Sequence, residues 1–142
     1  MELVIVILLL SILSVFALGG LFNRDQFAAK GFFDDTVNAV RFAQKLAIST
    51  GCDVRVLTTA SSYALHQRPG CTGAGFTIPV QNPANRSNNY QNSSLPSGFT
   101  LTAGTIVFNA RGTVTSVPTF VTFTVATFSF RVYGQTGLVD VL

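Results

Sequence analysis

The chain has 142 residues, a net charge of +3 at pH 7 and only 11% charged residues. Its nine Lys and Arg residues are scattered, with no run of basic residues, so the composition does not indicate a nucleic-acid surface. After the first 22 residues the chain is rich in Thr, Ser, Asn, Gly, Val and Phe, which is typical of an extracellular β-rich domain and not of a cytosolic enzyme. The length suits one N-terminal segment followed by one small domain.

Residues 1–22 form the first predicted unit, because an apolar run fills residues 3–22 and only Ser11 and Ser14 interrupt it with hydroxyls. About twenty residues in a helix rise about 30 Å, the thickness of the hydrocarbon core of a bilayer. The run therefore predicts a transmembrane helix. A cleaved secretory signal is disfavoured because its first region would be basic and its apolar region shorter. A buried core helix of this length without a polar stripe is rare.

Glu2 stands directly before this apolar run. Burial of a carboxylate in apolar surroundings costs roughly several kcal/mol unless a positive group pairs with it. A simple single-span anchor explains the run but leaves Glu2 without a role. We therefore predict a helix that lies in a membrane and also packs against copies of itself.

Residues 2–13, ELVIVILLLSIL, resemble the N-terminus of type IV pilins and type II secretion pseudopilins. In that family a prepilin peptidase removes a short basic leader and methylates the new N-terminus, so the leader of this chain is expected upstream of Met1. The resemblance implies that Glu2 pairs with the N-terminal ammonium of a neighbouring subunit during filament assembly. It implies a single-pass protein of the bacterial inner membrane, with a periplasmic globular domain that enters a surface filament after assembly. The implied partners are other pilin or pseudopilin subunits, the inner-membrane assembly platform and the peptidase.

Residues 23–51 form the second predicted unit, a polar junction over 23–31 followed by an amphipathic helix. We expect Asp34 and Asp35 in the first turn of this helix, where they would cap free N–H groups and favour the helix dipole. Gly51 is expected to end it. An apolar stripe at helical spacing is formed by Val37, Val40, Ala43 and Ala47, with Phe42 and Leu46 beside it. This helix is expected to continue the first one and to pack on the β-rich part.

Residues 52–142 form the third predicted unit, a small antiparallel β-domain that resembles a sandwich or a rolled sheet. Alternating apolar residues and turn signals predict strands at 53–58, 63–67, 76–79, 105–109, 120–126, 128–133 and 138–141. The polar stretch 81–98 is predicted to be a long surface loop. The fold class is therefore α+β.

Cys52 and Cys71 are the two cysteines of the chain, and they flank a segment that reads as one hairpin. A disulfide between them would stabilise the domain by about 3 kcal/mol on the chain-entropy estimate. Free thiols in a core are the alternative. A metal site is less favoured, because two sulfurs and the single histidine, His66, do not complete a tetrahedral set. We predict a structural disulfide in an oxidising compartment.

No motif for catalysis appears in the sequence, and neither an enzymatic activity nor a cofactor is expected. A finer resemblance, carried by residues 33–52, 54–56, 63–68, 108–112 and 133–139, is to minor pilins of the GspH/FimT group. Within it the chain looks closest to a minor pilin of mannose-sensitive haemagglutinin (MSHA) pili. This implies a structural subunit of an MSHA-like type IV pilus or of a type II secretion pseudopilus. The alternative is a DNA-binding minor pilin for DNA uptake, for which Arg131 is the candidate contact residue.

Overall fold

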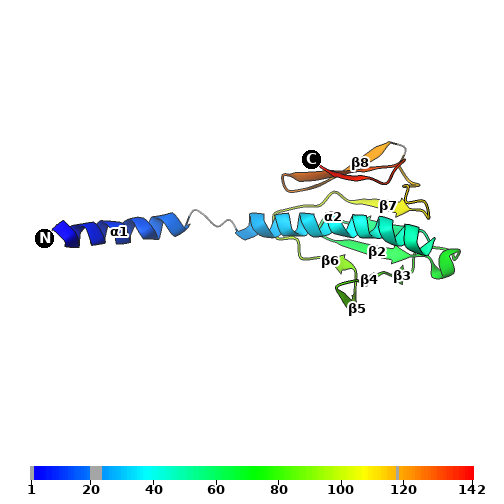
Figure 1. The fold of residues 1–142 in the computed structure, drawn as a ribbon, viewed down its shortest axis with the longest axis horizontal. Helices are drawn as coiled ribbons and strands as arrows, with labels where there is room; N and C mark the ends of the chain where they lie inside the picture. Colours follow the sequence, from blue (N-terminus) through cyan, green and yellow to red (C-terminus); the bar gives the residue numbers. More distant parts are fainter. Residues whose placement is uncertain (1, 20–23, 118) are drawn as a thin grey trace.

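The structure, a computed structural model, describes residues 2–19, 24–117 and 119–142. In these residues two helices come first, α1 (Glu2–Gly19) and α2 (Arg24–Thr50), and antiparallel strands follow. Figure 1 shows α1 extending away from the globular part, while α2 runs along the strands. The strands are β1 (Val54–Thr58), β2 (Tyr63–Gln67), β3 (Ile78–Pro79), β4 (Gln81–Asn82), β5 (Asn85–Asn89), β6 (Gln91–Asn92), β7 (Gly104–Phe108), β8 (Phe120–Val125), β9 (Phe128–Tyr133) and β10 (Val139–Val141), with a 3-10 helix η1 (Pro69–Cys71) between β2 and β3.

The structure corrects the predicted start of the second helix. α2 begins at Arg24, so the described part of the expected junction is helical, and Asp34 and Asp35 lie inside the helix and cap nothing. The reason is that the buried stripe starts further upstream than the sequence pattern suggested. It consists of Ala29, Phe32, Phe33, Thr36, Val37, Ala39, Val40, Ala43 and Ala47.

The predicted end of α2 is confirmed at Gly51. Its backbone has φ +68°, and its N–H donates to the carbonyl oxygen of Ala47 at 3.0 Å. Glycine adopts this left-handed conformation without the penalty that a Cβ imposes, which is why it commonly follows the last turn of a helix.

The strands form two main sheets that wrap around α2. The large sheet has the order β3-β2-β1-β7, with β6 also paired to β2, and the small sheet has the order β10-β9-β8. β2 and β9 have the predicted bounds, and the other five predicted strands differ from the observed ones by one or two residues at an end. The strong alternation of buried and half-buried side chains along these strands explains the agreement.

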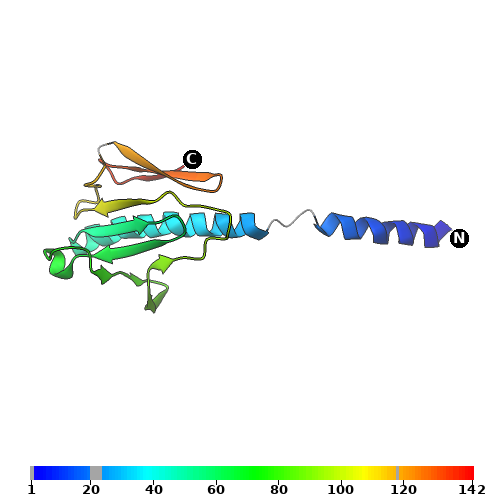
Figure 2. The ribbon, with the colours of Figure 1, turned by 180° about the vertical axis from the view of Figure 1, so that it is seen from behind.

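The predicted sandwich of two sheets needs correction, because α2 covers the inner faces of both sheets. Figures 1 and 2 show the small sheet above α2, β2 and β3 of the large sheet below it, and β7 of the large sheet between α2 and the small sheet. α2 contacts strands of both sheets. The core therefore joins one helix stripe to two sheet faces. Its largest fully buried side chains are Tyr63, Phe33, Phe108, Phe123, Phe130, Leu65 and Ile106.

The stretch predicted as a loop over 81–98 contains β4, β5 and β6. β4 and β5 form a separate two-stranded sheet whose side chains are almost all exposed. The sequence lacks apolar alternation here, so it gave no strand signal. Tyr90, 9% exposed, holds the segment in place: its carbonyl oxygen accepts from the N–H of Leu65 at 3.1 Å, and its N–H donates to Val80 at 2.6 Å.

Among the residues that the structure describes, no helix is both long enough and apolar enough to cross a membrane. The segment 1–22, for which a transmembrane helix was predicted, includes residues 1 and 20–22, which lie outside the described ranges.

Replacing Gly137 with Ala is expected to lower the free energy of unfolding by at least about 2 kcal/mol. Gly137 has φ +66°, and a Cβ there would collide with the carbonyl oxygen of Gly112 and the side-chain amide of Gln44. Gly98→Ala is the matched control, because its φ is +92° but a Cβ would meet open space. Urea unfolding measures both variants. Equal losses at the two positions would show that the close packing around Gly137 contributes nothing.

Candidate assembly surface

The helix α1 exposes a continuous apolar surface. Between Leu3 and Ile12, the part of α1 whose side chains the structure describes, the large apolar side chains range from 46% exposed at Ile12 to 73% at Leu3. The hydroxyl of Ser11 donates to the carbonyl oxygen of Leu8 at 2.8 Å, so this polar group is satisfied within the helix. A helix that is apolar all round is normally covered by protein or lipid. The described part of α1 is therefore a candidate interaction surface.

Glu2 lies in the first turn of α1, at the end farthest from the globular part, and its side chain is exposed (Figure 1). A carboxylate at this end is favoured by the partial positive charge of the helix N-terminus. The geometry leaves Glu2 accessible to another molecule. Its role in pairing with a neighbouring subunit stays a prediction.

Asp35 fixes α2 to the large sheet through a half-buried polar cluster. Its Oδ2 accepts from the hydroxyl of Tyr63 at 2.5 Å and from the side-chain amide of Asn92 at 2.8 Å. Burial, and next the hydrogen bond to Asp35, raise the pKa of Tyr63 far above its ordinary value. Burial and the charge of Asp35 also raise the pKa of Tyr90. Because these groups hold α2 to β2 and β6, Asp35 has a structural role that the sequence reading missed.

The predicted disulfide between Cys52 and Cys71 is present, with the two Cα atoms 4.7 Å apart. It connects the end of α2 and the start of β1 to η1. Next to it, the guanidinium groups of Arg55 and Arg68 lie over the ring of Phe76, at 5.1 and 4.5 Å from its centroid. Together these contacts close the segment between β2 and β3 onto the outer side of the large sheet.

His66, paired with Arg55 across β1 and β2, belongs to the same region. Its Nδ1 is buried without a hydrogen-bond partner. Burial, and next the positive charge of Arg55, lower the pKa of His66 below its ordinary value. Within the described ranges no three or more His, Cys, Asp or Glu side chains are grouped to hold a metal ion. His66 is therefore placed as a neutral strand residue.

Arg131, the candidate DNA contact, lies on β9 and is half-buried. Its guanidinium carbon is 5.1 Å from the centroid of the Phe120 ring, and its Nε is buried without a hydrogen-bond partner. Its cross-strand neighbour on β10 is Asp140, an acidic residue. This surrounding does not favour a phosphate site, and DNA binding through Arg131 stays an untested prediction.

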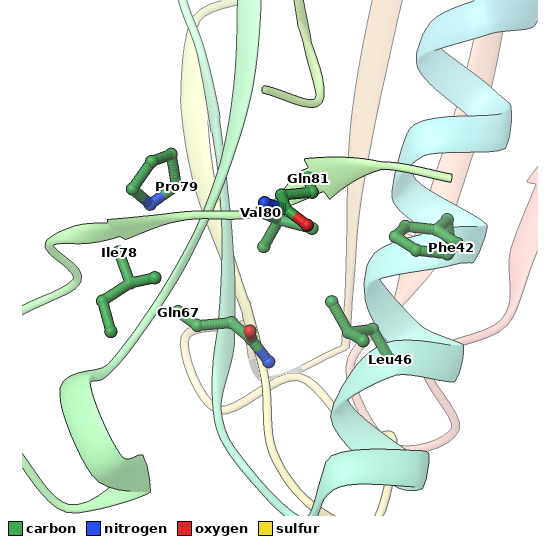
Figure 3. Close-up of a pocket in the computed structure, with 7 residues that line it drawn as sticks. All are labelled: Phe42, Leu46, Gln67, Ile78, Pro79, Val80 and Gln81. Atoms are coloured by element: carbon green, nitrogen blue, oxygen red, sulfur yellow. The ribbon is translucent and has the colours of Figure 1, made fainter. Parts of the chain in front are cut away.

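A groove of about 330 Å³ runs between α2 and the strands β3 and β4 (Figure 3). Val80 is buried, Phe42 and Leu46 of α2 are half-buried, and Ile78 is 45% exposed. Gln67 and Gln81 add amide groups to this mostly apolar lining. The sequence offered one signal for it: Phe42 and Leu46 sit beside the main apolar stripe of the helix and were expected in the core. We call these six residues, together with Pro79, the β3 groove.

Comparison with models of known protein families finds no match, and neither does comparison with curated protein sequences. The fold does match solved structures. The type IV minor pilin FimU of Pseudomonas aeruginosa is 14% identical with a TM-score of 0.56, covering 84% of this chain and 89% of that one. The minor pseudopilin EpsH from the Type 2 Secretion System of Vibrio cholerae is 17% identical with a TM-score of 0.55, covering 84% and 97%. The chain therefore has a pilin-like α+β fold.

Replacing Tyr63 with Phe is expected to lower the free energy of unfolding by about 1–3 kcal/mol at pH 7, because a hydrogen bond to a charged group is lost. It should also weaken the loss of stability at alkaline pH. The raised pKa of folded Tyr63 means that the unfolded chain releases the proton first, so stability falls as the pH rises above about 10. The raised pKa of Tyr90 should leave some loss of stability above pH 10 in the Tyr63→Phe variant.

Urea unfolding between pH 7 and pH 11 measures this effect. Tyr133→Phe on β9 is the matched control, a tyrosine outside the Asp35 cluster. A slope above pH 10 that is the same in Tyr63→Phe and in the original protein would contradict the prediction.

Replacing both Cys52 and Cys71 with Ser is expected to lower the free energy of unfolding by about 3 kcal/mol, because an open loop gives the unfolded chain more conformations. Thiol labelling of protein taken directly from cells should modify neither cysteine before reduction and both after it. Free labelling before reduction would show that the bridge does not form in the cell. The reduced original protein serves as a control, since it should unfold like the double variant.

Proposed function

We propose that this chain is a structural subunit, a minor pilin or pseudopilin, that assembles with other pilin-like subunits through α1. The observation that carries the proposal is the exposed apolar surface of α1 joined to a globular part with a pilin-like fold. In a filament, helices of neighbouring subunits would cover this apolar surface. Burial of several large apolar side chains per subunit, at about 1.5–3 kcal/mol each, would supply the driving force.

Glu2 would set the register of this assembly. Packed among apolar helices, its carboxylate would require a positive partner, and the N-terminal ammonium of a neighbouring subunit fits that need. The pairing is possible only at one axial offset between two helices, so it selects one arrangement among many similar apolar contacts. A periplasmic location before assembly, and a pilus or pseudopilus afterwards, accord with the fold.

The finer proposal is a minor pilin of an MSHA-like type IV pilus or a pseudopilin of a type II secretion system. Solved structures from both kinds of machine share this fold. We propose no enzymatic activity and no cofactor: Asp35 is engaged by hydrogen bonds with Tyr63 and Asn92, and burial lowers the pKa of His66 on its strand.

Glu2→Ala is expected to reduce incorporation of the subunit into filaments by at least about tenfold, because removing one partner of a buried ion pair costs about 3–5 kcal/mol. The measurement is the amount of subunit in filaments sheared from cells, divided by its amount in whole cells. Ser11→Ala is the control on the same helix, since its hydroxyl bonds only within α1.

Unchanged incorporation of Glu2→Ala would overturn this role of Glu2. Deletion of the gene separates the two machines in the same strain. Loss of surface pili identifies a pilus subunit, and loss of protein export with normal pili identifies a pseudopilin.

A further inference from the structure

The two main sheets end on opposite flanks of α2. β3 is the outer strand of the large sheet, and β10 is the outer strand of the small sheet. Figures 1 and 2 show β3 with β4 on one side of α2 and the C-terminal strand on the other. The β3 groove therefore opens on one flank of α2, and the edge of β10 lies on the other.

The edge of β10 carries apolar side chains. Leu138, Val141 and Leu142 are 57%, 46% and 56% exposed. On the side that faces β9, the N–H of Tyr133 donates to the carbonyl oxygen of Leu138, and the N–H of Leu142 donates to the carbonyl oxygen of Ser129. We call Leu138, Val141 and Leu142 the β10 edge.

The outer side of β10 also has an open stretch of backbone, at Val141. Because hydrogen-bonded and non-bonded positions alternate in an antiparallel pair, Val139 and Val141 direct their N–H and C=O groups away from β9. Arg41 donates to the carbonyl oxygen of Val139 at 3.3 Å. Among the described residues the backbone groups of Val141 have no hydrogen-bond partner. An apolar edge strand with free backbone groups is a site where another chain can pair.

We propose that the β10 edge of one copy of this chain docks into the β3 groove of a second copy. The apolar side chains of the edge meet an apolar lining formed by Phe42, Leu46 and Ile78, and the amides of Gln67 and Gln81 offer partners for open backbone groups. This inference rests on the proposed function and names the contact that neighbouring globular parts make in the filament.

Charge supports the same occupant. Lys45 is exposed on α2, directly before Leu46 of the groove, and it has no ion pair among the described residues. Asp140 is exposed in the middle of β10, between the apolar residues of the edge, and likewise has no ion pair there. Docking would bring Asp140 of one copy next to Lys45 of the other at the rim of the β3 groove. This charge pairing favours a second copy as the occupant over the apolar interior of a lipid bilayer.

Symmetry supports it as well. A groove on one flank that takes an edge from the opposite flank is a head-to-tail contact, in which each copy uses two different surfaces. In an open assembly such a contact leaves one groove and one edge free at the ends. It repeats along a helical filament when the rotation between copies does not close into a ring, whereas a contact of one surface with itself closes into a dimer.

The test is cross-linking of the purified full chain in detergent, with one new cysteine per variant and the native disulfide intact. Gln81→Cys marks the groove and Leu142→Cys marks the edge. With a short bismaleimide, the yield of cross-linked dimer should be at least about tenfold higher in the mixture of the two variants than in either variant alone. Thr124→Cys, exposed on β8, replaces either member in the control mixtures.

A charge swap gives a second readout. Lys45→Asp in the groove variant should lower the dimer yield about fivefold, and Asp140→Lys in the edge variant should restore it when the two are mixed. The proposal is overturned if the mixture of Gln81→Cys and Leu142→Cys gives no more dimer than the mixtures that contain Thr124→Cys. It is also overturned if Gln81→Cys alone gives as much dimer as that mixture. The Glu2→Ala measurement in cells does not involve these residues, so failure of this contact and failure of the filament role are separate results.

Discussion

The buried stripe of α2 is the constraint on which the globular part depends. Ala39, Val40, Ala43 and Ala47 are fully buried, and their small size lets both sheets approach the helix closely. Larger residues at the N-terminal end of the stripe, Phe32 and Phe33, fill the wider space where rings from both sheets converge. One helix therefore replaces the second layer that a β-domain of this size needs, and neither sheet has a complete core without it.

Polar contacts fix where α2 sits along and between the sheets. Asp35 binds the large sheet from the middle of the helix, and Gln44 donates to the carbonyl oxygens of Gly112 and Thr136 at 3.1 and 3.0 Å nearer its end. Apolar packing alone is tolerant of small shifts along a helix axis, whereas these hydrogen bonds lose their geometry within an ångström or so.

The sequence predicted most strands because each has one buried face. The bounds of β2 and β9 follow from alternating side chains, and the disulfide follows from two cysteines flanking one hairpin. It did not predict the start of α2 or the role of Asp35, because acidic residues in a helix have the same local pattern whether they cap it or bind a distant tyrosine. The strands between residues 81 and 92 were missed for a related reason: they are polar, and Tyr90 is the one buried side chain of that stretch.

The sheets of the same chain cover α2 but leave α1 exposed, so the two helices have different roles. α2 buries its apolar stripe within one chain, so the globular part has a complete core before any assembly. α1 exposes its apolar residues between Leu3 and Ile12, and other molecules are needed to cover them. Folding and assembly thus depend on different residues of two successive helices. A substitution in the core should change how much subunit is present, whereas a substitution on α1 should change how much of it enters a filament, and this difference makes the two effects separable by experiment.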